Sequence, residues 1–179
     1  IDDIPADNIH DGSRVRFGPD RRLYMTMGDA NMRSSAQDLA SLNGKILRLT
    51  DAGGTPADNP RASPVYTLGH RNPQGIDWHP VSGDLWESEH GEVGNDEINS
   101  IAPGGNYGWP VIQGAESRPD MRAPVLFFSP SVAPSGVSFY SGSLMPALRF
   151  DLFVATLRGQ HLLRVRFDPA DPRRVVATE

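Results

Sequence analysis

Residues 15–29 read VRFGPDRRLYMTMGD, which is two short apolar runs around a turn of glycine, proline and aspartate. Apolar and aromatic runs of this length on either side of such a turn predict a β-hairpin. The same plan recurs at IDWHPVSGDLWESEHG (76–91) and, with a longer turn, at VSFYSGSLMPALRFDLFVATLRG (137–159). Antiparallel hairpins that recur at a fixed spacing are typical of a β-propeller or a solenoid. The aromatic residues that close the first strand of each hairpin stand 61 residues apart: Phe17, Trp78 and Phe139.

A period of about sixty residues fits one four-stranded antiparallel blade with long loops. We therefore predict an all-β chain of about three propeller blades; strand–turn–strand units of a β-sandwich are the other interpretation. Three blades do not close a ring, and proteins avoid open sheet edges, so we expect residues 1–179 to be a partial β-propeller truncated at both ends. Strands are predicted at 14–17, 22–27, 45–49, 74–78, 84–88, 137–140, 151–156 and 162–167, with a helix near Ala36–Leu42 and a loop at 51–60.

The composition agrees with a β protein that is rich in turns. Its 179 residues include 18 glycines and 16 prolines, and the hydrophobic content is 38%. The 17 basic residues are scattered and the net charge is −5, so we expect no nucleic-acid partner. No apolar run approaches the roughly 18–20 residues of a membrane span. The chain has no cysteine, which excludes disulfides and thiol chemistry.

His10 and Asp29 are the first candidate pair for catalysis. His10 precedes the first strand of the first hairpin and Asp29 follows its second strand, so both fall at the same end of the predicted blade. A carboxylate beside an imidazole makes the imidazole a better proton acceptor near neutral pH. A surface histidine and an unrelated turn aspartate are the alternative interpretation.

The segment GHRNPQG (69–75) gathers one guanidinium and two amides around a proline turn. A permanent cation beside fixed neutral amides suits a planar polar ligand with carbonyl oxygens. A turn capped by its own side chains is the alternative.

The segment EHGEVGNDEINSIAPGGNYGWP (89–110) is rich in both acids and glycines and matches no standard metal motif. Ca²⁺ nevertheless takes about six to eight oxygen ligands, often mixing carboxylates with backbone carbonyls. Gly91 can turn its carbonyl inward, and Asp96 and Glu97 add carboxylate oxygens. A calcium-binding loop explains acids and glycines together, whereas a solvated acidic loop explains the acids alone.

The chain resembles the soluble PQQ-dependent aldose dehydrogenases, the glucose/sorbosone dehydrogenase family, in six segments taken in order: HDGSRVRFGPDRRLYMTMGDA, LASLNGKILRL, YTLGHRNPQGIDWHP, ESEHGEVGNDEIN, GGNYGWPVI and APSGVSFYSG. The resemblance covers nearly all 179 residues and implies the central half of a six-bladed β-propeller. It also implies an oxidoreductase that uses PQQ and Ca²⁺ to oxidise an aldose sugar at C1 to the lactone. The resemblance further leads us to expect a periplasmic or secreted location.

The resemblance implies roles for individual residues. His10 corresponds to the base that takes the proton from the C1 hydroxyl, and Asp29 to the carboxylate that orients this base. Arg71 corresponds to the cation at the quinone oxygen where negative charge develops. The implied PQQ contacts are Asn72, Gln74, His90, Ser131, Leu157 and Arg158.

For calcium, the resemblance implies the backbone carbonyls of Gly91 and Glu92 as ligands of the ion that PQQ chelates. Glu97 and Tyr107 correspond to ligands of a second, structural calcium. Glu92 departs from the proline that is usual in the family, and Ser129 stands where many relatives have an aromatic residue. The arginine segment that clamps the PQQ carboxylates in the family follows the region where this chain ends, so we expect the chain on its own to bind PQQ weakly.

Two other functions stay open. A calcium-dependent propeller that hydrolyses lactones is one, although its acids would be expected around the central channel rather than in one segment. A non-catalytic propeller that binds carbohydrate or protein is the other, although such a protein has no need of His10, Asp29 and Arg71 together. The expected partners are an aldose and an electron acceptor, with no nucleic acid and no membrane span.

Overall fold

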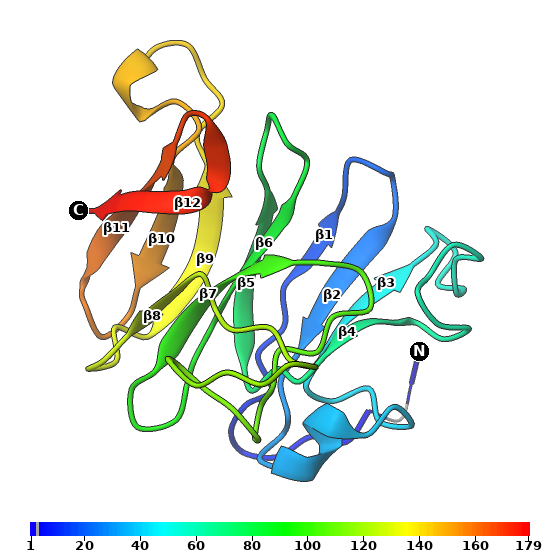
Figure 1. The fold of residues 1–179 in the computed structure, drawn as a ribbon. Coiled ribbons are helices and arrows are strands. Elements are labelled where there is room, and N and C mark those ends of the chain that lie inside the picture. Colours follow the sequence, from blue (N-terminus) through cyan, green and yellow to red (C-terminus); the bar gives the residue numbers. More distant parts are fainter. Residues whose placement is uncertain (3) are drawn as a thin grey trace.

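The computed structural model describes residues 1–2 and 4–179 and contains three four-stranded antiparallel sheets, in each of which the strands follow in chain order (Figure 1). Each sheet is one propeller blade, which confirms the predicted fold class. The first blade comprises β1 (Val15–Phe17), β2 (Leu23–Met27), β3 (Lys45–Leu49) and β4 (Val65–Leu68); the second β5 (Pro73–Trp78), β6 (Leu85–Glu89), β7 (Asp96–Ile101) and β8 (Leu126–Phe128); the third β9 (Pro134–Phe139), β10 (Leu152–Thr156), β11 (His161–Asp168) and β12 (Asp171–Thr178). Two 3₁₀ helices, η1 (Arg33–Gln37) and η2 (Pro146–Leu148), lie between strands.

The repeat in the sequence corresponds to one position in each blade. Phe17, Trp78 and Phe139 are the last residues of β1, β5 and β9. The spacing of 61 residues is therefore the distance along the chain from one blade to the next. Their partners in the neighbouring strands are all leucines: Leu23, Leu85 and Leu152.

Neighbouring blades pack through aromatic rings at equivalent positions. Trp78 of the second blade contacts Tyr24 of the first edge-on, with ring centres 5.1 Å apart. Phe139 of the third blade contacts Trp86 of the second in the same manner, with ring centres 6.3 Å apart. Tyr24 and Trp86 each follow the leucine that begins their strand, so one packing arrangement is built twice. Aromatic pairs of this kind add about 0.5–1.5 kcal/mol to the stabilisation from burial.

Asp77 ties the innermost strands of all three blades together. Its Oδ1 lies 2.9 Å from Nη1 of Arg16 on β1, and its Oδ2 accepts the backbone N–H of Phe139 on β9 at 2.8 Å. The residue is only 8% exposed, so water competes weakly for these contacts. One carboxylate on β5 therefore connects the first and third blades to the second.

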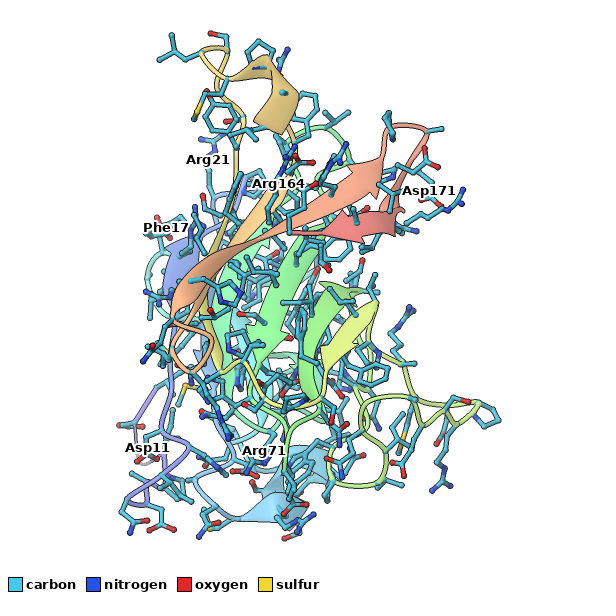
Figure 2. The ribbon with its side chains drawn as sticks, turned by 90° about the vertical axis from the view of Figure 1, so that its left-hand side faces the viewer. Asp11, Phe17, Arg21, Arg71, Arg164 and Asp171 are labelled. Carbon is cyan, nitrogen blue, oxygen red and sulfur yellow. The ribbon has the colours of Figure 1, made fainter. Side chains whose placement is uncertain are left out.

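The loops that carry the predicted site lie at one end of the molecule. Figure 2 shows Asp11 and Arg71 at the lower end, and Arg21 and Asp171 in turns near the opposite end. The lower end gathers the segments that precede β1, β5 and β9 and those that follow β2, β6 and β10.

The eight predicted strands are confirmed to within a few residues, as is the loop at 51–60, whereas four strands were not predicted: β4, β7, β8 and β12. β7 lies in the acid-rich segment, and Asp96, Glu97 and Asn99 occupy buried positions where a strand is ordinarily apolar. The predicted helix at Ala36–Leu42 is wrong. A short 3₁₀ helix spans Arg33–Gln37 instead, and Asp38 after it is extended. Within the described residues, no helix is both long and apolar enough to cross a membrane.

Asp77→Ala is expected to lower the free energy of unfolding by roughly 1–3 kcal/mol, because the buried Phe139 N–H loses its acceptor and Arg16, which keeps the carbonyl of Ile76, loses its carboxylate partner. Urea unfolding measures the change. Asp120→Ala is the control, since Asp120 is exposed and makes one long contact of 3.9 Å to Arg118. We expect the control to change stability by less than about 0.5 kcal/mol. Equal stability of the two variants would contradict the proposed tie.

Candidate active site

His10 and Asp29 form a hydrogen-bonded pair, as the sequence predicts. His10 Nδ1 lies 2.7 Å from Asp29 Oδ1, and the Asp29 side chain is fully buried. Because an ionised carboxylate only accepts, Nδ1 carries the hydrogen and Nε2 keeps the lone pair that can take a proton. His10 has a φ of 61°, a backbone conformation that is uncommon outside glycine and that recurs at active sites.

Arg71 lies directly beside this pair. Its carbonyl accepts the backbone N–H of Asp29 at 2.8 Å, and its Nη1 donates to the carbonyl of His90 at 3.1 Å. Its buried Nε has no partner within the described residues. Burial lowers the pKa of Arg71, but a guanidinium stays charged at neutral pH. The site therefore offers a cation with a free N–H next to a histidine base.

Asn72 and Gln74 bond to each other and lie against the His10 loop. Gln74 Nε2 donates to Asn72 Oδ1 at 3.0 Å. A Cβ added at Gly12 would stand 1.9 Å from Gln74 Nε2, and one at Gly28 would stand 1.8 Å from the His10 carbonyl oxygen. Only glycine allows backbone and side chains to approach so closely. Gly12 therefore lets the His10 loop approach the second blade, and Gly28 lets the same loop pack against the end of β2.

The turn after β6 presents His90 and Gly91 to the same end. His90 Nε2 lies 2.8 Å from the carbonyl of Pro134, and burial lowers the pKa of His90. The Gly91 N–H donates to Asp96 Oδ1 at 3.0 Å. In the described part of the chain, no hydrogen-bond donor contacts the carbonyl of Gly91 or that of Glu92. The resemblance implies these two carbonyls as calcium ligands, and neither is used by a hydrogen bond among the described residues.

The third blade contributes a loop that Asp96 holds in place. Asp96 Oδ2 accepts the Ser131 hydroxyl at 2.7 Å and the backbone N–H groups of residues 132 and 133 at 2.8 and 2.7 Å. The backbone N–H groups of Leu157 and Arg158 donate to the same loop. The side chains of Leu157 and Arg158 are exposed. Asp96 is thus a structural acceptor rather than a free oxygen donor.

Glu92 forms a two-pronged ion pair with Arg33 of η1. Its two carboxylate oxygens accept from Arg33 Nη1 and Nη2 at 3.0 and 2.8 Å. The Arg33 guanidinium in turn lies over the Trp109 ring, 4.6 Å from its centre. The added negative charge at position 92 is therefore neutralised by a partner in the first blade.

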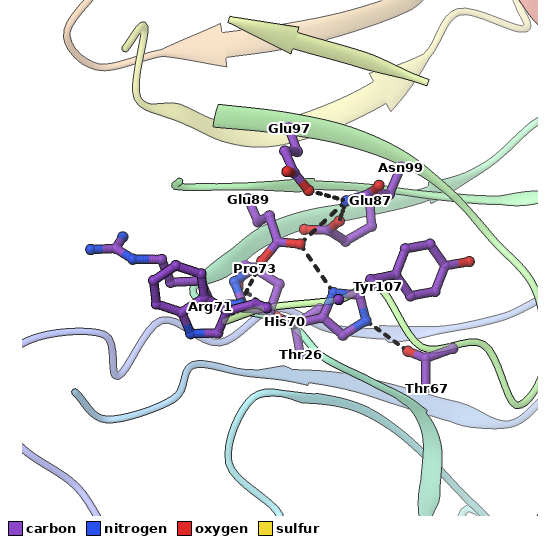
Figure 3. A network of polar contacts seen from close by, with 12 residues as sticks. Thr26, Thr67, His70, Arg71, Pro73, Glu87, Glu89, Glu97, Asn99 and Tyr107 are labelled. Atoms are coloured by element: carbon purple, nitrogen blue, oxygen red, sulfur yellow. Dashed lines mark hydrogen bonds and ion pairs between the residues drawn. The ribbon is translucent and has the colours of Figure 1, made fainter. Parts of the chain in front are cut away.

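A second polar cluster lies in the second blade, where three buried carboxylates surround the amide nitrogen of Asn99 (Figure 3). Asn99 Nδ2 lies 3.0 Å from Glu87 Oε2, 3.2 Å from Glu89 Oε1 and 3.4 Å from Glu97 Oε2. An amide nitrogen carries two hydrogens and cannot satisfy three acceptors. His70 Nδ1 lies 3.2 Å from Glu89 Oε1, and the backbone N–H groups of Arg71 and Gly114 donate to Glu89 Oε2 and Glu97 Oε1 at 2.6 and 2.8 Å. Burial raises the pKa of Glu87, and raises that of Glu97 to about 8, with the Glu89 charge as the second cause.

The residues around this cluster fit the structural calcium that the resemblance implies. Glu87 Oε1, Asn99 Oδ1 and Gln113 Oε1 are buried oxygens without a partner among the described residues. A cavity of about 10 Å³ lined by Glu97, Tyr107 and Gln113 among others is large enough for one water or ion. Buried carboxylate and amide oxygens are ligands that suit Ca²⁺. The Tyr107 hydroxyl already bonds to backbone groups, at 2.8 Å to the carbonyl of residue 100 and to the N–H of residue 102. Its backbone carbonyl is therefore the better candidate ligand.

Three residues of the site were not predicted from the sequence: Trp109, Arg33 and Asn99. Trp109 Nε1 donates to Asp29 Oδ2 at 2.8 Å, a contact across 80 positions that no local pattern reveals. The cluster around Asn99 does have a signal, because Glu87 and Glu89 alternate at the period of a strand and therefore face the same side.

These features define a class of protein: a β-propeller whose blade loops bring a histidine–carboxylate pair and a guanidinium together at one end. Comparison with known proteins gives the particular family. The Glucose / Sorbosone dehydrogenase family matches residues 2–179, and the chain belongs to this family.

Named relatives agree with this assignment. The aldose sugar dehydrogenase YliI of Escherichia coli is 36% identical over 173 residues, which cover 86% of this chain and 47% of the relative. The quinoprotein glucose dehydrogenase B of Acinetobacter calcoaceticus is 39% identical over 134 residues, which cover 62% of this chain and 28% of the relative. The PQQ-bound structure of the aldose sugar dehydrogenase of Streptomyces coelicolor superposes with a TM-score of 0.88 at 38% identity and covers 99% of this chain and 50% of that one. The chain thus spans about half the length of these relatives or less.

The acid cluster predicts a pH-dependent stability. Between the ordinary value of 4.5 and about 8, folded Glu97 keeps a proton that the unfolded chain releases. The free energy of unfolding is therefore expected to fall as pH rises through this window, by at most about 1.4 kcal/mol per pH unit for each such group. Urea unfolding in EDTA at several pH values measures the slope. Glu97→Gln is expected to make the slope shallower, and the exposed control Glu116→Gln is expected to leave it unchanged. Identical slopes in both variants would contradict a proton held at Glu97.

Proposed function

We propose that this chain carries the catalytic centre of a PQQ- and calcium-dependent oxidoreductase that oxidises an aldose sugar at C1 to the lactone. The His10–Asp29 pair beside Arg71 is the observation that carries the proposal. Membership of the family and the PQQ-bound relative support the choice of cofactor.

His10 acts as the base in this proposal. Its Nε2 takes the proton of the C1 hydroxyl, while Asp29 fixes the ring through Nδ1 and stabilises the imidazolium that forms. When bound, PQQ and the Ca²⁺ that it chelates supply a hydride acceptor and a Lewis acid. Arg71 places a permanent positive charge where negative charge develops, which lowers the barrier without reorganisation of solvent.

The remaining loop residues would hold the cofactor and its ions. The carbonyls of Gly91 and Glu92 would bind the Ca²⁺ at the site, and Glu97 with Tyr107 would bind the structural Ca²⁺. The electron acceptor is a soluble protein or small molecule, and we propose a periplasmic or secreted location on the same resemblance. The side chains proposed to contact PQQ are Asn72, Gln74, His90, Ser131, Leu157 and Arg158.

His10→Asn is expected to reduce sugar oxidation by a factor of roughly 10²–10⁴, because it removes the base. The assay uses the protein produced from the complete reading frame, with PQQ, Ca²⁺, an aldose and a redox dye. Asp11→Asn, an exposed neighbour, is the control and is expected to retain activity. Hydrolysis of a lactone without PQQ would indicate the hydrolase instead, and sugar binding without turnover of either kind would indicate a binding propeller.

Calcium is expected to stabilise the folded chain through the acid cluster. At a hundredfold excess over its dissociation constant, a ligand that binds only the folded state adds about 2.7 kcal/mol to the free energy of unfolding. Thermal unfolding with EDTA and with added Ca²⁺ measures this increase. Glu97→Gln is expected to abolish most of it, and Glu116→Gln to preserve it. A transition temperature that does not respond to Ca²⁺ in the unmodified protein would refute the structural calcium.

A further inference from the structure

We propose that Trp109 is a positioning residue that locks His10, Asp29 and Arg71 into one array. The inference deepens the proposed function and rests on it for the catalytic consequence. The array itself rests on contacts within the described chain.

The first contact is a hydrogen bond to the buried carboxylate. Trp109 Nε1 donates to Asp29 Oδ2 at 2.8 Å, and Trp109 is only 5% exposed. The other oxygen, Asp29 Oδ1, is occupied by His10 Nδ1 at 2.7 Å and by the Asn31 N–H at 2.9 Å. Among the described residues, the indole of Trp109 is the only hydrogen-bond donor to Asp29 Oδ2. It therefore fixes the rotation of the carboxylate that orients His10.

The second contact is to the cation of the site. The Arg71 guanidinium lies 5.2 Å from the centre of the Trp109 ring, within the range of a cation–π interaction. One side chain thus contacts both the carboxylate partner of the base and the guanidinium. The position of the Trp109 ring therefore influences how the side chains of Asp29 and Arg71 are placed relative to each other.

Both the backbone and the ring of Trp109 are held in place. Its backbone N–H donates to the carbonyl of Gly69 at 3.0 Å, and its backbone carbonyl accepts from Gln37 Nε2 at 2.7 Å. Arg33 covers the ring at 4.6 Å from its centre and is held there by Glu92. Arg33 of the first blade and Glu92 of the second together hold the indole in place.

Loss of the indole N–H would leave Asp29 Oδ2 buried without a donor. The Asp29 carboxylate could then rotate, and the orientation of the His10 ring that it holds would become less well defined. A group that only positions a base is expected to affect kcat more than KM, because the array matters most in the transition state.

The experiment compares Trp109→Phe with Trp86→Phe. Both changes replace an indole by a phenyl ring at a buried position, and Trp86 Nε1 has no hydrogen-bond partner in the described structure. The pair therefore separates loss of the N–H contact to Asp29 from loss of ring volume. Proton NMR of the His10 Nδ1–H, which needs no activity, is the first readout, and the split between kcat and KM for aldose oxidation is the second.

We expect Trp109→Phe to broaden or lose the His10 Nδ1–H signal and to lower kcat about 10–100-fold with KM changed less than about threefold. Trp86→Phe is expected to keep both the signal and kcat. A His10 signal and a kcat in Trp109→Phe that match those of Trp86→Phe would overturn the proposal. If the unmodified protein oxidises no aldose, the proposed function fails, and the NMR comparison still decides whether Trp109 positions His10.

A second replacement covers the case in which Trp109→Phe does not fold. Benzothienylalanine at position 109 replaces the indole N–H by sulfur while keeping the size of the ring. Loss of the His10 Nδ1–H signal in this protein supports the proposal, and retention of the signal refutes it.

Discussion

Contacts between sheet faces hold this chain together, because the strand ladders run within each blade and stop at its innermost strand. Neighbouring blades are therefore joined by side chains and by backbone hydrogen bonds of the loops, such as those between Leu68 and residues 105 and 107. Aromatic rings do this where the blades face each other, with Trp78 on Tyr24 and Phe139 on Trp86. At the inner strands, the buried carboxylate of Asp77 reaches both neighbours at once. These side chains and the backbone hydrogen bonds between the loops together set the relative placement of the blades.

The candidate site inherits its geometry from the same arrangement. Asp29 belongs to the first blade and Arg71 to the second. The backbone N–H of Asp29 donates to the carbonyl of Arg71. The base, its carboxylate and the cation therefore stand at a joint between blades rather than within one of them. Buried polar groups at such a joint gain strength from the low dielectric, provided that each has its partner. Trp109 supplies the partner that Asp29 Oδ2 needs.

The sequence predicted the parts that depend on local periodicity. The three hairpins and the meeting of His10 with Asp29 follow from the repeats and from the strand ends that a loop joins, whereas the place of Arg71 in the site was implied by the family resemblance. It did not predict β7, because Glu97 and Asn99 occupy buried strand positions that are ordinarily apolar. Nor did it predict the contact of Trp109 with Asp29, since nothing local marks an indole for a carboxylate 80 residues away. Local pattern fixes where elements form, whereas contacts between distant polar groups require the folded arrangement.

Asp96 shows how the loops of two blades become dependent on each other. Its Oδ1 accepts the Gly91 N–H, and its Oδ2 accepts three donors from residues 131–133. An insertion in the loop around Gly91 or in residues 131–133 would move donors away from the Asp96 carboxylate. We therefore expect the lengths of these two loops to change together during evolution. Exchange of a whole blade between homologues would succeed only if both loops travelled with it.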